Sequence, residues 1–296
     1  MALATNPIDI NRASNSIQLP PELSADIWAA AQEESAVMRL VERIDLPGPG
    51  VTIPVITGEP VADFVAETAE KPVSNSTFSL KQMTPYKIAV IELFSNEFRR
   101  DLPALYRELV RRLPYSIGRK FDATVFGGTA PGSNFDVLTN STAVGIGGGS
   151  GVYPRLVDVV STLAAGNAEL TGWAMSPQGE AALLAAVDSQ ERPIFIASPT
   201  EDGSVGRLLG APVENSKAVF KAGTPNIIGF AGDWSQARYG IVDGINLAIS
   251  DEASINTGEG IVNLWQRNMF AVRVEAELGF VVKNAAAFVK ITDAEE

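Results

Sequence analysis

The sequence predicts an α+β fold in which one long helix lies over strands, and three features of the chain indicate it. Apolar residues recur at helical spacing from Asp101 to Phe121. Residues 270–278 alternate between an apolar and a more polar face, which is typical of a half-buried strand. Short apolar runs separated by Gly and Pro fill much of the rest. With 296 residues, the chain has room for about two domains.

The N-terminal part predicts an arm followed by a helix. Residues 1–19 are polar, so we expect an extended arm that cannot fold alone. A helix is predicted from Pro20 to about Val41, because Pro is well suited to a first helical turn. The Pro-Gly-Pro-Gly run at residues 47–50 then ends it.

A long two-stranded excursion is expected next. Val51–Ile56 predicts a short strand, which Pro54 restricts to an edge or a bend. Residues 58–84 mix charged residues with Val, Phe and Thr, and we expect them to reach away from a compact core. Lys87–Phe94 predicts an apolar strand that returns to the body.

The clearest predicted helix begins at Asp101. Asp101 is a suitable N-cap, and Pro103 falls in the first turn, where it costs no hydrogen bond. The apolar stripe continues to Phe121 for more than five turns. Pro114 and Gly118 lie inside it and predict a kink.

The remaining segments predict a mixed region rich in turns. Glycines crowd residues 127–151, and we expect a mobile loop at Gly145–Ser150. Gly279 is expected to end the alternating strand. The other predicted elements are helices over Arg155–Ala165 and Ser176–Val187 and strands over Thr171–Met175, Arg207–Val213, Asn226–Ala231, Arg238–Ser250, Phe280–Lys283 and Phe288–Ile291.

The composition excludes several kinds of chemistry, because the chain has no Cys and no His. Thiolate nucleophiles, iron–sulfur clusters, histidine metal ligands and Ser-His-Asp triads are therefore excluded. With a net charge of −12, the chain is not expected to bind nucleic acid in general. We also expect no signal peptide, no membrane span, no cofactor and no catalytic residue.

Three motifs contain residue types that occur in phosphate-binding, dinucleotide-binding or hydrolytic sites. Gly127–Ser133 has spacing like a phosphate-binding loop but lacks its Lys, and Gly145–Ser150 lacks the last Gly of a dinucleotide fingerprint. Glu275 and Glu277 share the polar face of a strand, where solvation is the ordinary state. A carboxylate-based hydrolase remains an alternative, because such enzymes need only two carboxylates in different environments.

Opposite charges gather in two segments. Residues 99–120 carry seven basic and two acidic residues, a net of +5, whereas acids are frequent in the excursion at residues 58–84. We therefore predict that the basic helix meets the acidic excursion of a neighbouring copy. The predicted subunit-interface residues are Glu59, Asp63, Glu67, Glu70, Lys71, Arg107, Arg111, Arg112 and Arg119.

The arm, the excursion and the Gly-rich loop all lack partners within a compact monomer. Elements that cannot be buried in their own chain are usually buried against another copy. Since the chain also lacks the common catalytic residue types, we expect a building block and not an enzyme.

Several segments resemble those of one known family in their order and spacing. They are Leu19–Glu22, Ala62–Glu67, Phe121–Gly128, Leu278–Val282 and, as the most specific match, Gly232–Ile241. On these segments the sequence resembles the HK97-like phage major capsid proteins over most of its length. The resemblance implies an HK97-like capsid fold with a long spine helix, an extended β loop, and peripheral and axial domains.

The resemblance also implies a domain organisation and a function. Such subunits form hexamers and pentamers of an icosahedral shell around double-stranded DNA, assembled in the host cytoplasm and kept in the virion. An encapsulin-type nanocompartment shell, which shares the fold, is the second alternative. The implied parts are an N-terminal arm and first helix at 1–50, the extended loop at 51–93, the peripheral domain at 94–153 and 266–296, and the axial domain at 154–265.

Partners follow from the same resemblance. We expect other copies of the chain, weak non-specific contact with packaged DNA, a portal, and a separate scaffolding protein, because the chain reaches the arm almost at once. Some family members crosslink a loop Lys to an Asn. Lys71 or Lys81 with Asn284 would be the partners here, but no local motif marks them, and we expect no crosslink.

Overall fold

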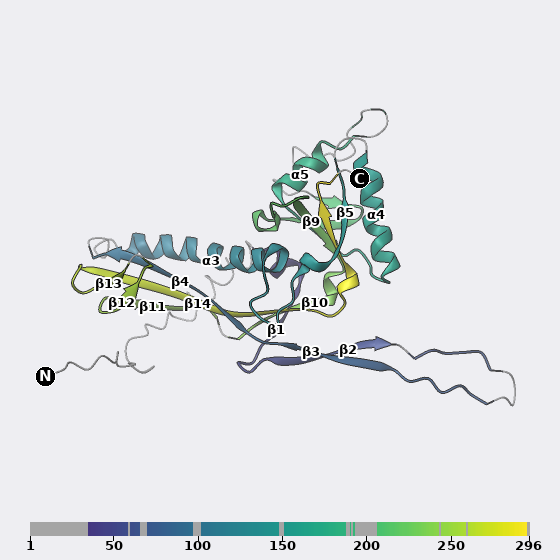
Figure 1. Cartoon of the computed structure of the whole chain (residues 1–296), viewed down its shortest axis with the longest axis horizontal. Helices are drawn as coiled ribbons and strands as arrows, with labels where there is room; N and C mark the ends of the chain where they lie inside the picture. Colours follow the sequence, from purple (N-terminus) through teal and green to yellow (C-terminus); the bar gives the residue numbers. More distant parts are fainter. Residues whose placement is uncertain are drawn as a thin grey trace. The chain divides into compact units, whose positions relative to one another are not determined.

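Figure 1 shows the computed structural model of the protein, whose elements confirm the predicted α+β class. The chain divides into two compact units, each described by itself below. Unit 1 comprises residues 1–31, 87–117 and 243–277, and unit 2 comprises residues 32–86, 118–242 and 278–296. The structure describes residues 35–58, 60–65, 70–96, 102–147, 151–187, 190, 192, 206–242, 244–258 and 260–294, without the side chains of residues 102–114.

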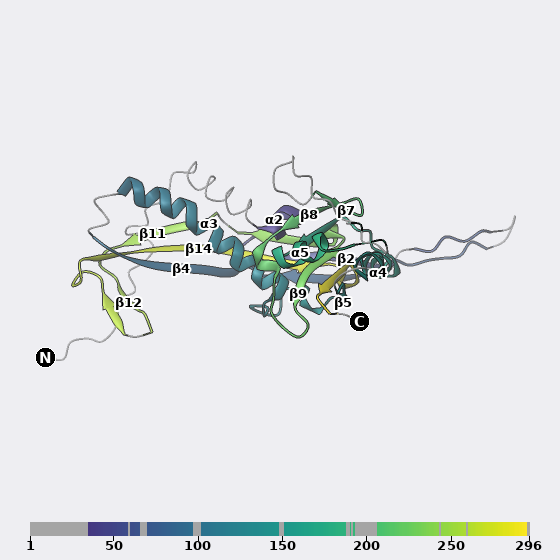
Figure 2. The same ribbon diagram turned by 90° about the horizontal axis from the view of Figure 1, so that it is seen from above.

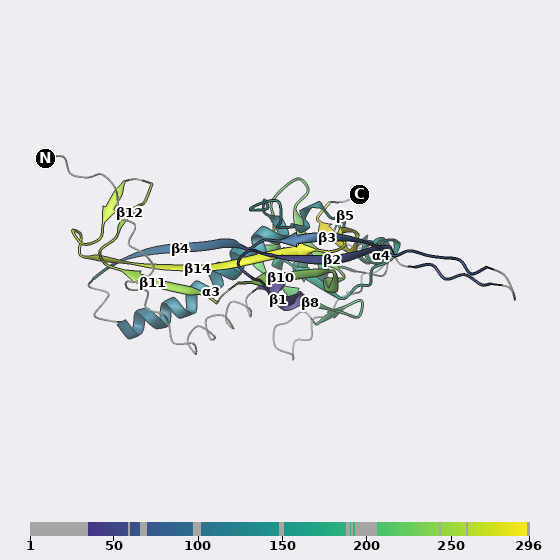
Figure 3. The same cartoon turned by 90° about the horizontal axis from the view of Figure 1, so that it is seen from below.

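Unit 1 contains a sheet of long strands. Strands β4 (Tyr86–Ser95) and β11 (Asn246–Ser250) both pair with β14 (Met269–Val282), and the three run side by side in Figure 3. The predicted apolar face is confirmed in this part of β14, since Phe270, Val272, Val274 and Ala276 are buried. On the other face Arg273 is exposed, but Ala271 is buried.

A helix and a small hairpin complete unit 1. Helix α3 (Leu102–Gly127) begins here and runs along one side of the sheet (Figures 1 and 2). The helix is continuous through Pro114 and Gly118, and the kink expected at these residues stays a prediction. Strands β12 (Ser254–Asn256) and β13 (Ile261–Asn263) form a hairpin that projects from the sheet (Figures 2 and 3).

Unit 2 is built on a six-stranded sheet with the strand order β5-β15-β9-β6-β8-β7. The pairs β15–β5 and β6–β8 are parallel and the others are antiparallel. The strands are β5 (Thr142–Gly145), β6 (Gly172–Met175), β7 (Arg207–Leu208), β8 (Ala211–Asn215), β9 (Ile227–Gly232) and β15 (Phe288–Thr292). Strands β5 and β15 therefore belong to this sheet although they lie outside residues 154–265, the range expected for the axial domain.

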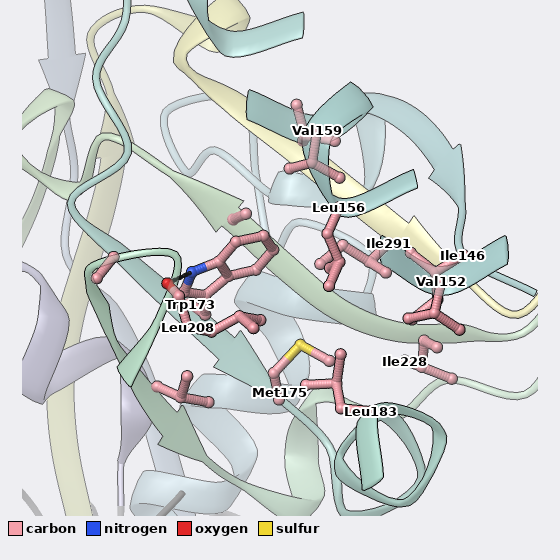
Figure 4. Packing of buried hydrophobic residues seen from close by; sticks show 14 of the residues in the cluster. Ile146, Val152, Leu156, Val159, Trp173, Met175, Leu183, Leu208, Ile228 and Ile291 are labelled. Atoms are coloured by element: carbon pink, nitrogen blue, oxygen red, sulfur yellow. Dashed lines mark hydrogen bonds between the residues drawn. The ribbon is translucent and has the colours of Figure 1, made fainter. Parts of the chain in front are cut away.

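One face of this sheet is covered by helices α4 (Val152–Ala165) and α5 (Pro177–Leu184). Figure 4 shows Leu156 and Val159 of α4 and Leu183 beside Trp173 and Met175 of β6 in one apolar core. Ser176, the first residue of the predicted helix, is the N-cap of α5, because its Oγ accepts a hydrogen bond from the Gly179 N–H.

The opposite face packs against aromatic side chains. Phe126, near the end of α3, lies 5.2 Å from Phe230 of β9 between ring centroids, and Trp234 lies 5.3 Å from Phe288. A second aromatic group surrounds Phe121 of α3. Its members, with ring centroids 6.2–6.4 Å from Phe121, are Phe135, Tyr239 and Phe280.

Unit 2 also holds a second ladder and the excursion. Strand β10 (Ala237–Ile241) lies between β1 (Glu42–Asp45) and the last residues of β14. Strands β2 (Val51–Gly58) and β3 (Thr77–Met83) form the predicted long hairpin (Figure 1). The short helices of this unit are α2 (Ala36–Leu40), η2 (Leu138–Asn140), η4 (Lys217–Val219), η5 (Trp234–Gln236) and η6 (Ala285–Ala287).

Four sequence predictions about elements are wrong. Gly279 does not end β14; it faces Gly240 across the ladder, and a Cβ there would lie 2.7 Å from Cγ of Met83, so the glycine makes room for that side chain. The first part of the predicted mobile loop Gly145–Ser150 is ordered: Gly145 ends β5, Ile146 is buried, and the N–H groups of residues 146 and 147 donate to the carbonyls of Thr292 and Ala294. Residues 148–150 lie outside the described residues. The predicted strands Arg207–Val213 and Arg238–Ser250 are each two strands.

The predicted first helix is only partly covered by the description. Residues 20–34 lie outside the described residues, and α2 occupies Ala36–Leu40. Val41, the predicted last residue, is the C-cap of α2.

Candidate assembly surfaces

The β2–β3 hairpin exposes an apolar stripe. The cross-strand pairs Pro54–Leu80 and Ile56–Phe78 place four apolar residues on one face, and we call them the hairpin stripe. The side chains of Ile56, Phe78 and Leu80 are 72%, 71% and 66% exposed, and Phe64 beyond β2 is fully exposed. Soluble monomers seldom expose a continuous apolar surface without a binding role.

The root of the hairpin is fixed to the body of unit 2. The Lys81 Nζ donates to Asp136 Oδ2 at 2.8 Å and to the carbonyl of Val282 at 2.6 Å. The same carboxylate oxygen accepts the Val282 N–H at 2.8 Å. Met83, at the end of β3, is fully buried against the facing glycines Gly240 and Gly279. The hairpin is thus held at one end and exposed at the other.

The acidic half of the predicted charge seam is partly described. Asp63 and Glu70 are exposed at the outer part of the hairpin, and so is the basic interface candidate Lys71. Glu59 and Glu67 lie outside the described residues.

The basic half of the seam lies on α3. Arg107, Arg111 and Arg112 belong to this helix, but their side chains are outside the description. Arg119, which precedes the buried Asp122 by three residues, is exposed. The electrostatic seam between copies therefore stays a prediction.

A buried carboxylate that the sequence reasoning missed joins three elements of unit 2. Asp122 of α3 accepts hydrogen bonds from the Ser35 Oγ at 2.5 Å, the Ala36 N–H at 2.8 Å and the Val37 N–H at 3.3 Å. The hydroxyl of Ser216, next to η4, donates to it at 3.2 Å. We call this arrangement the Asp122 clamp.

The clamp is electrostatically unusual because all four donors are neutral. Burial raises the pKa of Asp122 from 3.8 to about 6, and the hydrogen bonds offset part of that rise. Both hydroxyl oxygens in the clamp also accept backbone N–H groups, from Met38 and Ala218. A hydroxyl can donate or accept, so the clamp can be satisfied with Asp122 ionised or protonated.

The sequence held a signal for this residue. Asp122 precedes the buried Phe126 by four residues and therefore shares its helix face. A carboxylate on a buried face needs hydrogen-bond partners, which in this case come from segments about 90 residues away in the chain.

The two crosslink candidates on the hairpin have different surroundings. The Lys81 amine is engaged at the hairpin root, whereas Lys71 is exposed. Asn284 caps η6, accepting the Ala286 N–H at 3.0 Å through Oδ1.

A polar cavity of about 340 Å³ lies beside β2. Thr57, Asn167, Asp233, Lys283 and Asn284 are among the residues that line it. Burial lowers the pKa of Lys283, and the nearby charge of Arg238 lowers it further, while carboxylates partly oppose the shift.

The carboxylate pair Glu275 and Glu277 lies on the more polar face of β14, where both residues are half-buried. The Lys87 Nζ is 3.7 Å from Glu275 and 3.2 Å from Glu277, and Arg273 is 3.6 Å from Glu275. In the part of the chain that the structure describes, no three His, Cys, Asp or Glu residues are grouped to hold a metal. No described helix is long and apolar enough to span a membrane.

Comparison with known proteins gives a family and relatives. The phage capsid family matches residues 16–293. The probable major capsid protein gp17 of Mycobacterium phage L5 is 32% identical over 293 residues, covering 93% of this chain and 89% of that protein. Its counterpart in Mycobacterium phage D29 is 30% identical and covers 93% of this chain and 90% of that protein.

Solved structures agree. A chain from Gordonia phage Cozz superposes with a TM-score of 0.73 at 26% identity, over 89% of this chain and 87% of its own length. A chain from Mycobacterium phage Adephagia gives 0.72 at 19% identity, which supports the fold alone.

Proposed function

The chain belongs to the phage capsid family and is a major capsid protein with the HK97-like fold; from this premise we propose how it assembles. Copies form hexamers and pentamers that close into an icosahedral shell around double-stranded DNA. The observation that carries the proposal is the hairpin stripe, which is apolar and has no cover in its own chain among the described residues.

The hairpin's construction supports a role between copies. Its root is fixed by Lys81 and Met83, so its outer part is presented in a defined direction from unit 2. Burial of the three exposed side chains Ile56, Phe78 and Leu80 on another subunit would contribute roughly 1.5–3 kcal/mol each before the costs of association.

The charge seam remains part of the proposal. The basic residues of α3, Arg107, Arg111, Arg112 and Arg119, would meet the acidic residues Glu59, Asp63, Glu67 and Glu70 on the hairpin of a neighbour. Lys71 would lie in the same contact surface. Opposite charges at such a surface mainly guide association and select register, and exposed pairs add little stability.

The domain division and the remaining partners are proposed as well. The axial domain would be residues 154–265 and the peripheral domain residues 94–153 and 266–296, with the arm at 1–50 and the loop at 51–93. Scaffolding protein, portal and packaged DNA are proposed partners, the DNA contacts being weak because the chain carries a net charge of −12. Assembly would occur in the host cytoplasm. The capsid names of the relatives do not favour an encapsulin.

Sedimentation and negative-stain microscopy of the purified protein test the proposal directly. Closed shells of uniform size are expected, and a persistent 31.4 kDa monomer would contradict it. On a denaturing gel the shells should give monomer bands only, because no crosslink is expected.

Charge reversal tests the seam separately. The double variant Arg111→Glu, Arg112→Glu should slow shell formation at low salt more than at high salt, because screening weakens the lost attraction. The matched control Lys217→Glu, Lys221→Glu makes the same charge change at two exposed sites of unit 2, outside α3. If the α3 variant assembles like this control, the seam is refuted while shell formation stands.

A further inference from the structure

The polar cavity beside β2 is built by parts of unit 2 that are distant in sequence. One wall is formed by residues 55–57 of the hairpin strand β2. The other walls come from the end of α4, from η5 and from the segment between β14 and η6, and their lining residues are Asn167, Ala168, Asp233, Gln236, Lys283 and Asn284. A volume of about 340 Å³ is many times the roughly 30 Å³ that a water molecule occupies in the liquid, so the cavity has room for a small ligand.

Three of the polar side chains in the cavity wall have a structural role of their own. Asp233 caps η5: Oδ1 accepts the Ser235 N–H at 3.0 Å, and Oδ2 accepts the Gln236 Nε2 at 3.3 Å. Asn284 caps η6 through its Oδ1. Asn167 has a φ of 52°, a left-handed conformation that asparagine tolerates well. The local backbone therefore explains these three residues without a ligand.

Lys283 has no such explanation. Its backbone is fixed, because its N–H donates to the Gln236 carbonyl at 2.7 Å and the preceding residue, Val282, contacts Lys81 and Asp136 at the root of the hairpin. Its half-buried side chain lines the cavity, and its amine makes no hydrogen bond or ion pair with any described residue. A fixed backbone thus presents an unpaired cation to the cavity.

The charges around this amine leave it short of a counterion. Burial lowers the pKa of Lys283, the charge of Arg238 lowers it further, and Glu42 and Asp233 only partly oppose the shift. Both carboxylates are already engaged, since Glu42 lies 2.7 Å from the Arg238 guanidinium and Asp233 accepts the two N–H groups described above. A ligand that brings negative charge would stabilise the protonated amine.

We propose that this cavity binds a small free oxyanion of the size of phosphate, with the Lys283 amine as its counterion. The amide nitrogen of Asn284, which the cap does not use, and the side chain of Asn167 can donate hydrogen bonds to the same ion. Because β2 forms one wall, the bound ion connects the hairpin to the body of unit 2 and holds β2 more firmly. The inference goes beyond the proposed function and does not depend on shell formation.

Thermal unfolding of unassembled subunits tests the binding, with sodium phosphate compared against sodium chloride at equal ionic strength. A dissociation constant of about 1 mM would raise the wild-type melting temperature by about 4 °C at roughly 50 mM phosphate. Lys283→Gln should weaken binding about tenfold and roughly halve this rise, because it removes the charged donor. Lys217→Gln makes the same charge change at an exposed site of unit 2 and should respond like wild type.

A second variant and hydrogen exchange locate the ion. Asn284→Asp keeps an oxygen that can cap η6 but adds a negative charge to the cavity, so it should remove the phosphate effect without lowering the melting temperature in chloride. In wild type, phosphate should slow amide hydrogen exchange in β2 and leave exchange in α5 unchanged. In Lys283→Gln, the slowing in β2 should be lost.

The inference is overturned if phosphate and chloride give the same wild-type melting temperature, or if Lys283→Gln keeps the full rise. Phosphate supplied as duplex DNA should have no effect, and a DNA effect that Lys283→Gln removes would overturn the assignment to a free ion. Failure of the wild-type protein to form shells would instead refute the proposed function and leave these measurements unaffected.

Discussion

The six-stranded sheet and the β2–β3 hairpin belong to the same unit but use apolar residues in opposite ways. In the sheet, Trp173 and Met175 are fully buried beneath α4 and α5. In the hairpin, Ile56, Phe78 and Leu80 are mostly exposed, although their apolar character is similar. The sheet therefore stabilises the subunit, whereas the hairpin is built to be stabilised by another subunit.

The largest effect on folding is expected from the centre of the sheet. Trp173→Ala removes a buried indole and leaves the Leu208 carbonyl without its donor, which should lower the free energy of unfolding by about 3–5 kcal/mol. Urea unfolding of unassembled subunits measures this. A loss below about 1 kcal/mol would show that the sheet core is not the stabilising region.

A smaller effect on the free energy of unfolding is expected at the Asp122 clamp, which, like the sheet core, lies inside the subunit. The pKa of Asp122 is about 6 when folded and 3.8 when exposed, so its stabilising contribution is complete at low pH and is lost as pH rises through 6. The free energy of unfolding should fall by about 1.4 kcal/mol between pH 5 and pH 7.5 on account of this group.

The variant Asp122→Asn isolates that contribution. It carries no titrating group, so the part of the pH dependence that differs between variant and wild type belongs to Asp122. Equal slopes in the two proteins between pH 5 and pH 7.5 would contradict the raised pKa.

The smallest effect on folding is expected at the hairpin stripe. Phe78→Ser with Leu80→Ser should change the free energy of unfolding by less than about 0.5 kcal/mol, because both side chains are exposed in the subunit. The same variant should fail to form shells. Gln82→Ser, an exposed polar change on the same strand, should assemble normally. If the double variant forms shells, the hairpin stripe is not required for assembly, and the proposed difference between the sheet and the hairpin is refuted.

Periodicity predicted elements well where one face is buried. The strand around Val272 and Val274 follows its predicted pattern, and so do the described side chains of α3, where Ile117 and Phe121 are buried. A single buried face leaves a clear period in the sequence. The hairpin is predictable for the opposite reason. Its many charged residues are unsuited to a buried core, so the segment is expected to extend away from the body.

The errors arise from long-range packing. Gly279 continues a strand because Met83, about 200 residues earlier, packs over it, and a local pattern cannot show this. The role of Asp122 could not be predicted from a local pattern, because its donors, Ser35 and Ser216, are distant in sequence. Of the predicted interface, charge statistics could suggest Asp63 and Arg119, but only three-dimensional exposure reveals the apolar hairpin stripe.

The root of the hairpin has a mechanical consequence. Among the described hairpin residues, Met83 alone is fully buried, and it rests on the facing pair Gly240 and Gly279. The hairpin is therefore fixed at its root, and a force applied at Phe64 acts as a torque on Met83 and on the Lys81–Asp136 pair. Internal pressure on a shell built from such hairpins would be resisted at these roots, which lie only a few residues along β3 from the hairpin stripe.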